Sequence, residues 1–208
     1  MRDILCMYYS RTGATRQAMT EIAQALDAEL VELTDGVDRQ GARGYLRSGM
    51  DAMRRATLPL APYETERPLS ESRLVILGPP VWAGRCASPV RALLKRRGLE
   101  LERVAYVLTR KSSRKYEEIY EQMDQYTARP HLLEVSLRPG AVGYEFWRDK
   151  LVGEVRDANS GDVLARCAAI GTPSKESVCW RNYKPSPGGW TRWSGSCRTR
   201  RCTPTGNP

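Results

Sequence analysis

Short runs of apolar residues alternate along the chain with longer segments in which apolar residues recur at helical spacing. The short runs have the length of β-strands, and the longer segments have the period of helices that bury one face. This alternation is typical of βα units, in which a helix connects two strands of a parallel sheet. The predicted strands span residues 4–9, 30–33, 74–78, 104–109 and 132–137.

Four helices are predicted among these strands. The first, residues 16–26, carries an apolar stripe, and the helix near residue 90 has Ser88 as a predicted N-cap and Pro89 at its first position. Two further helices are predicted at about residues 114–126 and 142–155. The whole pattern therefore predicts an α/β fold with a doubly wound five-stranded parallel sheet.

The connection over residues 34–73 is longer than a simple crossover requires. It leaves the carboxyl end of the second strand, where open α/β sheets bind ligands, and it contains an amphipathic segment over residues 44–55. Two interpretations remain open: a surface helix with a solvated basic face, or a helix whose arginines and Tyr45 flank an anionic ligand. Its apolar side carries Leu46, Met50 and Met53, with Arg43, Arg47, Arg54 and Arg55 nearby.

The pattern ends near residue 158. Residues 171–208 are rich in Pro, Gly, Ser, Thr and Arg and almost free of aliphatic residues. Such a segment cannot bury enough apolar area to offset the entropy of ordering. We therefore expect one folded domain over residues 1–165 and a disordered basic tail over residues 166–208. Three tryptophans in the tail would suit stacking on single-stranded nucleic acid, but an uncommitted tail is the preferred interpretation: Trp180, Trp190 and Trp193.

The location of the charge argues against a nucleic-acid-binding fold. Residues 171–208 carry seven Lys and Arg against one Glu, a net charge of +6, which leaves +3 of the total +9 for residues 1–170. The folded part is therefore only mildly basic, and no nucleic-acid partner is expected. No apolar run approaches the roughly 20 residues of a membrane span, and the N-terminus does not resemble a targeting signal, so a cytoplasmic protein is expected.

The reactive side chains exclude several chemistries. The six cysteines form no C-x-x-C pair and the chain has one histidine, so a metal site and His-dependent nucleophilic catalysis are both disfavoured. His131 precedes the last predicted strand, at the end opposite to the ligand edge, where a structural or solvent-facing role is expected.

The loop after the first strand has the composition of a phosphate site. A glycine and three hydroxyl residues stand directly before a helix, whose first N–H groups are unpaired and whose dipole favours an anion. Gly13 lets the backbone approach the anion closely. The loop comprises Ser10, Arg11, Thr12, Gly13, Ala14 and Thr15.

A second loop follows the strand that ends at Gly78, again just before a helix. Two prolines fix its backbone, two glycines permit tight turns, and Trp82 is expected to stay outside the sheet as an exposed ring that can stack on a planar ligand. The loop comprises Pro79, Pro80, Val81, Trp82, Ala83 and Gly84.

Together these loops make residues 3–157 resemble the flavodoxin family, whose sheet order is 2-1-3-4-5 and which binds FMN at the carboxyl edge. The family's phosphate loop has the form T/S-x-T-G-x-T, which Ser10, Thr12, Gly13 and Thr15 match, with Arg11 and Ala14 at variable positions. The resemblance implies that Trp82 covers the isoalloxazine ring. It also implies that a third loop, with Thr109, Arg110 and Lys111, borders the ring on its other side.

Two positions depart from the family pattern. Met19 stands where alanine is usual, which we interpret as a mild change on a helix face. Arg110 and Lys111 stand where the third loop is usually small, glycine-rich or acidic. Two readings remain open: these cations approach the N1 side of the flavin and raise its reduction potential, or they point to solvent.

The sequence lacks the motif residues that other phosphate-binding families require. A low-molecular-weight tyrosine phosphatase needs C-x5-R, but the count from Cys6 reaches Thr12 where the arginine should be. The chain also contains neither the dinucleotide-binding G-x-G-x-x-G nor the Walker P-loop motif.

The expected function is therefore that of an FMN-binding oxidoreductase. It would pass electrons from NAD(P)H, or a reduced redox protein, to a quinone or similar small acceptor. No side chain need act as acid or base, because the redox chemistry belongs to the flavin. A non-enzymatic electron carrier and a flavin-free binding module are the alternatives, although the mildly basic core does not suit the acidic low-potential carriers of the family. The oligomeric state stays open.

Overall fold

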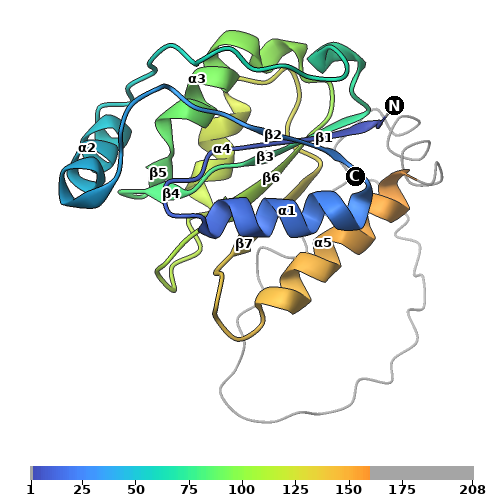
Figure 1. Cartoon of the computed structure of the whole chain (residues 1–208). Helices are drawn as coiled ribbons and strands as arrows, with labels where there is room; N and C mark the ends of the chain where they lie inside the picture. Colours follow the sequence, from blue (N-terminus) through green and yellow to red (C-terminus); the bar gives the residue numbers. More distant parts are fainter. Residues whose placement is uncertain (1, 160–208) are drawn as a thin grey trace, which may run out of the picture. The chain divides into compact units, whose positions relative to one another are not determined.

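The structure is a computed structural model that describes residues 2–159. A central sheet of five parallel strands has the order β2-β1-β3-β6-β7 (Figure 1). Since β4 and β5 form a separate pair, this is the predicted order 2-1-3-4-5, and the prediction of a flavodoxin-like sheet is confirmed. The strands are β1 (Ile4–Tyr8), β2 (Glu29–Glu32), β3 (Leu74–Gly78), β6 (Val104–Thr109) and β7 (Leu133–Leu137).

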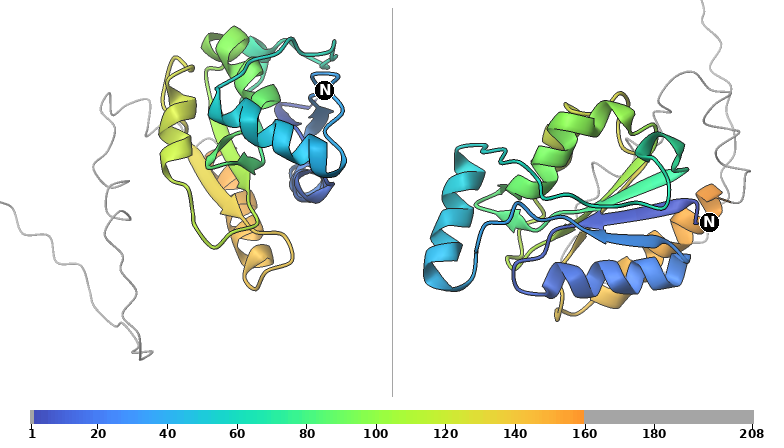
Figure 2. Two further views of the ribbon diagram at one scale, coloured as in Figure 1. Left: turned by 90° about the vertical axis from the view of Figure 1, so that its left-hand side faces the viewer. Right: turned by 45° about the horizontal axis from the view of Figure 1, so that its top comes forward.

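Helices cover both faces of the sheet (Figure 1, Figure 2). The α-helices are α1 (Ala14–Leu26), α2 (Gly41–Met53), α3 (Ser88–Arg97), α4 (Glu118–Asp124) and α5 (Tyr144–Asn159), and short 3-10 turns span Leu69–Glu71 and Gly98–Glu100. Alternate residues of β1 enter different cores: Cys6 packs with α1 and α5, whereas Leu5 and Met7 pack with α3 and α4. This two-sided burial explains why the inner strands β1 and β3 are continuously apolar.

The carboxyl ends of β1, β3 and β6 lie at one edge of the sheet, as parallel strands require (Figure 1). The chain leaves β3 into a two-stranded hairpin of β4 (Val81–Trp82) and β5 (Arg85–Cys86), and α2 packs beside this hairpin. The backbone N–H of Thr109 donates to the carbonyl of Pro79 at 3.1 Å. The second and third predicted loops are thus joined through their backbones.

Met19 is fully buried against the last residue of β3. A Cβ added at Gly78 would lie 2.5 Å from Met19 Sδ, closer than any side chain tolerates. The methionine therefore occupies the space that the glycine leaves open. The helix face on which Met19 was expected is thus a buried one, and the residue is part of the core that fixes α1 against β3.

Two helix predictions are corrected. The N-cap of α3 is Ala87, and Ser88 is the first helical residue, because the side chain of Ser88 accepts a hydrogen bond from Arg39 instead of capping its own helix. The predicted helix over 114–126 is shorter, since α4 begins at Glu118 after Tyr116, which has a left-handed φ of 60°.

Over residues 2–159, no helix combines the length and the hydropathy that crossing a membrane would require. The predicted tail, residues 166–208 with its three tryptophans, lies outside the described residues.

Candidate functional site

The start of α1 has the geometry of an anion site. Gly13 is the N-cap residue and adopts a φ of 88°, a left-handed conformation that favours glycine. Ser10 Oγ accepts the Gly13 N–H at 3.1 Å, and the helix begins with the bond from the Gln17 N–H to the Gly13 carbonyl at 2.8 Å. The first turn contains no acidic residue. The N–H groups that precede Gln17 in α1 therefore have no partner within the helix and face an open, electropositive space.

The predicted hydroxyl residues of this loop have different partners. Thr15 is 3% exposed, and its hydroxyl lies 2.6 Å from that of Thr109. This contact ties the start of α1 to the end of β6. Ser10 already accepts the Gly13 N–H, so Thr12 is the exposed hydroxyl of the loop. Thr15 thus contributes its backbone and positions the third loop, while its hydroxyl stays inside the protein.

The second loop is a tight hairpin. Ala83 and Gly84 form its turn with φ values of 47° and 72°, both left-handed, as a type I′ turn requires. The expectation that Trp82 lies outside any sheet and is exposed is wrong, because Trp82 belongs to β4 and is 8% exposed. Its ring meets Tyr9 edge-on at 5.3 Å between centroids. The accessible part of the loop is formed by Pro80, Val81, Ala83 and Gly84.

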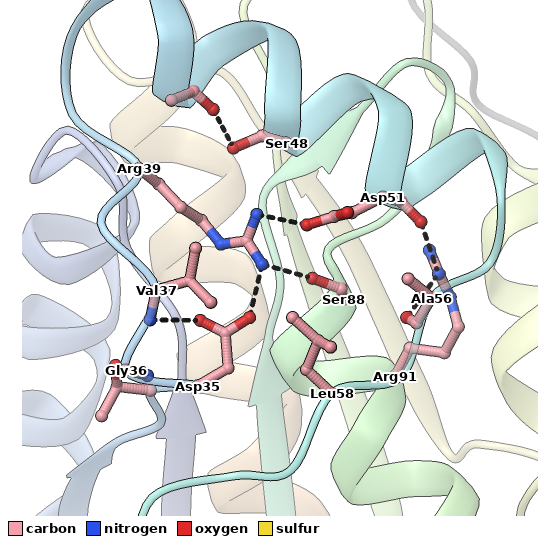
Figure 3. A network of polar contacts seen from close by, with 12 residues as sticks. Asp35, Gly36, Val37, Arg39, Ser48, Asp51, Ala56, Leu58, Ser88 and Arg91 are labelled. Carbon is pink, nitrogen blue, oxygen red and sulfur yellow. Dashed lines mark hydrogen bonds and ion pairs between the residues drawn. The ribbon is translucent and has the colours of Figure 1, made fainter.

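A buried arginine contacts this hairpin and takes part in a network of polar contacts (Figure 3). Arg39 is 2% exposed, and its guanidinium lies 5.1 Å from the Trp82 ring centroid. It donates hydrogen bonds to Asp51 at 2.6 Å, to Ser88 at 3.1 Å and to Asp35. Burial acts to lower the pKa of Arg39, but its hydrogen bonds to the two carboxylates outweigh burial and raise it. One charged group thus links α2, α3 and β4, and sequence reasoning did not single it out.

The helix α2 presents small residues to the protein and large ones to solvent. Gly44, Ser48 and Ala52 are buried, and a Cβ added at Gly44 would lie 2.0 Å from the backbone carbon of Arg39. The apolar residues of the predicted amphipathic segment are instead exposed: Tyr45 64%, Leu46 64%, Met50 44% and Met53 60%. At Gly44 the Arg39 backbone leaves no room for a side chain.

One cation of the phosphate loop reaches this helix. The Arg11 guanidinium lies 5.3 Å from the centroid of the Tyr45 ring. This contact places Tyr45 beside the predicted phosphate loop, and both interpretations of the segment stay predictions.

The third loop turns its arginine inward along the sheet edge. Arg110 Nε donates to Ser136 Oγ at 2.7 Å, and Arg110 Nη1 donates to the Ser112 carbonyl at 2.5 Å. Lys111 is exposed. Arg110 therefore holds its own loop against β7, and Lys111 is the cation of this loop that faces solvent.

Tyr116 belongs to the site edge although the sequence pattern assigned it to a helix face. Its hydroxyl accepts a hydrogen bond from Ser112 Oγ at 3.0 Å, and its ring stands 3.7 Å from the position that a Cβ on Gly84 would take. The guanidinium of Arg114 covers the ring at 5.1 Å. The left-handed backbone of Tyr116 produces this placement, and the apolar periodicity that suggested a helix could not reveal it.

The one histidine lies away from this edge, and the two cysteines among the described residues are buried. His131 precedes β7, as predicted, and hydrogen-bonds to Asp124 and Glu134, each at 2.8 Å. Burial acts to lower the pKa of His131, but these hydrogen bonds outweigh burial and raise it. Burial also raises the pKa of Cys6 and of Cys86 to about 12, so neither thiol is a nucleophile near neutral pH.

No family model matches the sequence, and no curated protein matches it. Solved structures match the fold. A flavoprotein from Lactobacillus acidophilus, crystallised in complex with FMN, is 20% identical with a TM-score of 0.53, over 71% of this chain and 99% of its own. Candidate flavoproteins from Bacteroides uniformis (19%, TM-score 0.59, 72% and 97%) and Bacteroides eggerthii (16%, TM-score 0.57, 73% and 96%) are similar in fold. The chain thus has a flavodoxin-like fold.

Proposed function

We propose that this protein binds FMN non-covalently at the carboxyl edge of the sheet and acts as an oxidoreductase. It passes electrons from NAD(P)H, or a reduced partner, to a quinone or similar acceptor. The observation that carries the proposal is the joining of three loops at one edge. The Thr15 hydroxyl contacts the Thr109 hydroxyl at 2.6 Å, and the Thr109 N–H bonds the Pro79 carbonyl at 3.1 Å.

The residues at the start of α1 fit a phosphate group. Gly13 has no heavy atom within 4 Å of a position where a Cβ would stand, so its backbone is open to a ligand. The free N–H groups of the first turn and the Thr12 hydroxyl are donors, and Arg11 adds a positive charge beside them. Ser10 and Ala14 complete this cradle for the FMN phosphate.

A planar ring would lie between the hairpin and the third loop. Pro80, Val81 and the turn residues would line one side, while Tyr116 and the segment from Thr109 to Lys111 would border the other. Trp82 would act as a positioning residue, because its ring is packed between Tyr9 and Arg39 and holds the hairpin in place. Bound FMN supplies the hydride and electron transfer chemistry, so the side chains need only bind, orient and shield it.

The relatives by fold and the charge of the edge support this proposal. The protein from Lactobacillus acidophilus was crystallised with FMN, and it covers nearly all of the described region. Arg11, Lys111 and the arginines of α2 make the surroundings basic, which favours an anionic donor such as NAD(P)H over a basic redox partner.

Anaerobic mixing tests the activity. Protein loaded with FMN is mixed with NADPH and, separately, with NADH, and the flavin absorbance is followed. We expect rapid loss of the absorbance with at least one donor, and its return when a soluble quinone is added. Bound FMN that neither donor reduces would contradict a nicotinamide-dependent activity and favour an electron carrier. Failure to bind FMN would contradict both.

A further inference from the structure

A cavity of about 20 Å³ lies between the end of α2, β5, α3 and α4. Three arginines from three segments line it: Arg55 after α2, Arg85 in β5 and Arg91 in α3. The amides of Gln122 and Gln125, from the region of α4, complete its polar surface. None of the residues that line the cavity is acidic, so three positive charges converge without a carboxylate among them.

Arg91 is the deepest of the three cations, with 6% exposure. Its guanidinium donates to the backbone carbonyls of Ala56 at 3.2 Å and of Asp51 at 3.5 Å (Figure 3), and also to that of Cys86. In contrast to Arg39, it has no carboxylate in salt-bridge contact among residues 2–159. Burial lowers the pKa of Arg91, and the charges of Arg85 and Arg55 act in the same direction. This cluster of charges would be stabilised by an anion.

Arg55 stands where a helix end favours glycine. The Ala56 N–H donates to the Asp51 carbonyl at 2.9 Å, and the Arg55 N–H donates to the Ala52 carbonyl at 3.1 Å. These two bonds form a Schellman motif, whose left-handed position is usually glycine. Arg55 holds this position with a φ of 53°, which is unfavourable for a residue with a Cβ. An arginine kept in an unfavourable conformation, with its side chain at the cavity, indicates a role for that side chain.

We propose that this cavity binds a small oxyanion through Arg55, Arg85 and Arg91. A volume of about 20 Å³ admits one or two oxygen atoms, which suits the tip of a phosphoryl group and excludes a ring. Arg55 and Gln125 are exposed and form the mouth, where the rest of the ligand would lie. Free phosphate and the 2′-phosphate of NADP(H) offer this chemistry equally.

Thermal unfolding of the full chain in inorganic phosphate tests the proposal, with chloride at the same ionic strength as reference. We expect phosphate at about 100 times its Kd to raise Tm by roughly 5–10 °C. Arg85→Gln should raise the Kd for phosphate at least tenfold. Arg55→Gly should also lose the phosphate response, yet raise Tm without phosphate by roughly 2–4 °C, because it removes the unfavourable backbone conformation. Arg129→Gln, an exposed arginine outside the cavity, is the control.

Opposite results overturn the proposal. Phosphate that raises Tm no more than chloride would exclude the site, as would Arg55→Gly and Arg85→Gln variants that keep the full response. Since phosphate could also reach the start of α1, Gly13→Ala should keep the response of this cavity, which separates it from the proposed FMN site. A comparison of NADP⁺ with NAD⁺ identifies the source: a larger Tm response to NADP⁺ than to NAD⁺ that Arg55→Gly abolishes assigns the 2′-phosphate, and the absence of such a difference assigns the free ion.

Discussion

The start of α1 and the end of α2 each contain a residue with a left-handed backbone. The residue is a glycine in the first case and an arginine in the second, and the two expose different groups. At the start of α1, Gly13 has a φ of 88° and exposes backbone N–H groups. At the end of α2, Arg55 has a φ of 53° and places a charged side chain at a cavity. Glycine gives the first site a backbone surface without side chains. Arginine adopts an unfavourable backbone conformation there and supplies a positive charge. We therefore propose that the first end binds an anion through backbone N–H groups and the second through a guanidinium.

The two ends also differ in what holds them. The start of α1 is fixed by local bonds and by the contact between Thr15 and Thr109. The helix α2 lies in the long connection between β2 and β3, and the buried contacts of Arg39 with Asp35 and Asp51 hold its position (Figure 3). Damage to the Arg39 contacts should therefore loosen α2 and the hairpin, while the start of α1 keeps its geometry.

The largest expected effect follows from Arg39→Met. Removing the guanidinium leaves Asp35, whose side chain is 1% exposed, buried without its ion pair. We expect a loss of about 3–5 kcal/mol in the free energy of unfolding, measured by urea denaturation. Arg16→Met removes an exposed ion pair with Glu32 and should cost less than about 1 kcal/mol. Equal losses of unfolding free energy in the two variants would show that Arg39 does not hold α2 in place.

The next effect concerns the glycine of α1. Gly13→Ala puts a Cβ into the space proposed for the FMN phosphate and strains a left-handed backbone, so FMN affinity should fall about 100-fold, or about 2.7 kcal/mol. Gly36→Ala is the control, because Gly36 also has a positive φ, 68°, and open surroundings. It should lower stability similarly and leave FMN affinity unchanged. Similar FMN affinities in both variants would contradict the phosphate site.

Two glycines of α2 should respond with opposite signs. Gly44→Ala forces a Cβ onto the Arg39 backbone and should destabilise the protein by roughly 1–3 kcal/mol. Gly49→Ala meets no atom within 4 Å on the same helix and should stabilise it by up to about 1 kcal/mol. Both values come from chemical denaturation. A Gly44→Ala variant as stable as Gly49→Ala would mean that α2 does not pack against Arg39.

The smallest effect lies at the opposite edge of the sheet and should leave both helix ends unchanged. Because the folded-state pKa of His131 is raised, its protonated form adds stability that is present below about pH 6.5 and is lost as pH rises through the folded value. His131→Asn should therefore cost on the order of 1 kcal/mol more at about pH 5.5 than at about pH 9. A cost independent of pH would show that the contacts with Asp124 and Glu134 do not involve the charged imidazole.

The sequence predicted the sheet well because each strand is marked locally. The bounds of β3 and β6 match the predicted residues, and the loop with Gly13 lies directly before α1, between β1 and this helix. The partners of single side chains were not predictable in the same way. The sequence around Trp82 is typical of a loop with an exposed stacking ring. The ring is instead packed against Arg39, which is 43 residues away in the chain.

The helix α2 shows a second reason why the surroundings of single side chains were not predictable. Apolar spacing in α2 marks Leu46, Met50 and Met53 as one face, yet this face is exposed, and the buried face consists of small residues, of which Gly44 meets the Arg39 backbone. Similarly, Tyr116 fits the apolar stripe of a helix, but its left-handed backbone places it beside the hairpin. Periodicity reports which residues share a face, whereas close backbone contacts decide which face turns inward.

An FMN titration followed by flavin fluorescence tests the central claim most directly. The account predicts saturable binding of one FMN per chain with a Kd of about 1 µM or lower, equivalent to about −8 kcal/mol, and a Kd about 100-fold higher for Gly13→Ala. Absence of saturation up to about 1 mM FMN, or equal binding by the wild-type chain and Gly13→Ala, would contradict it.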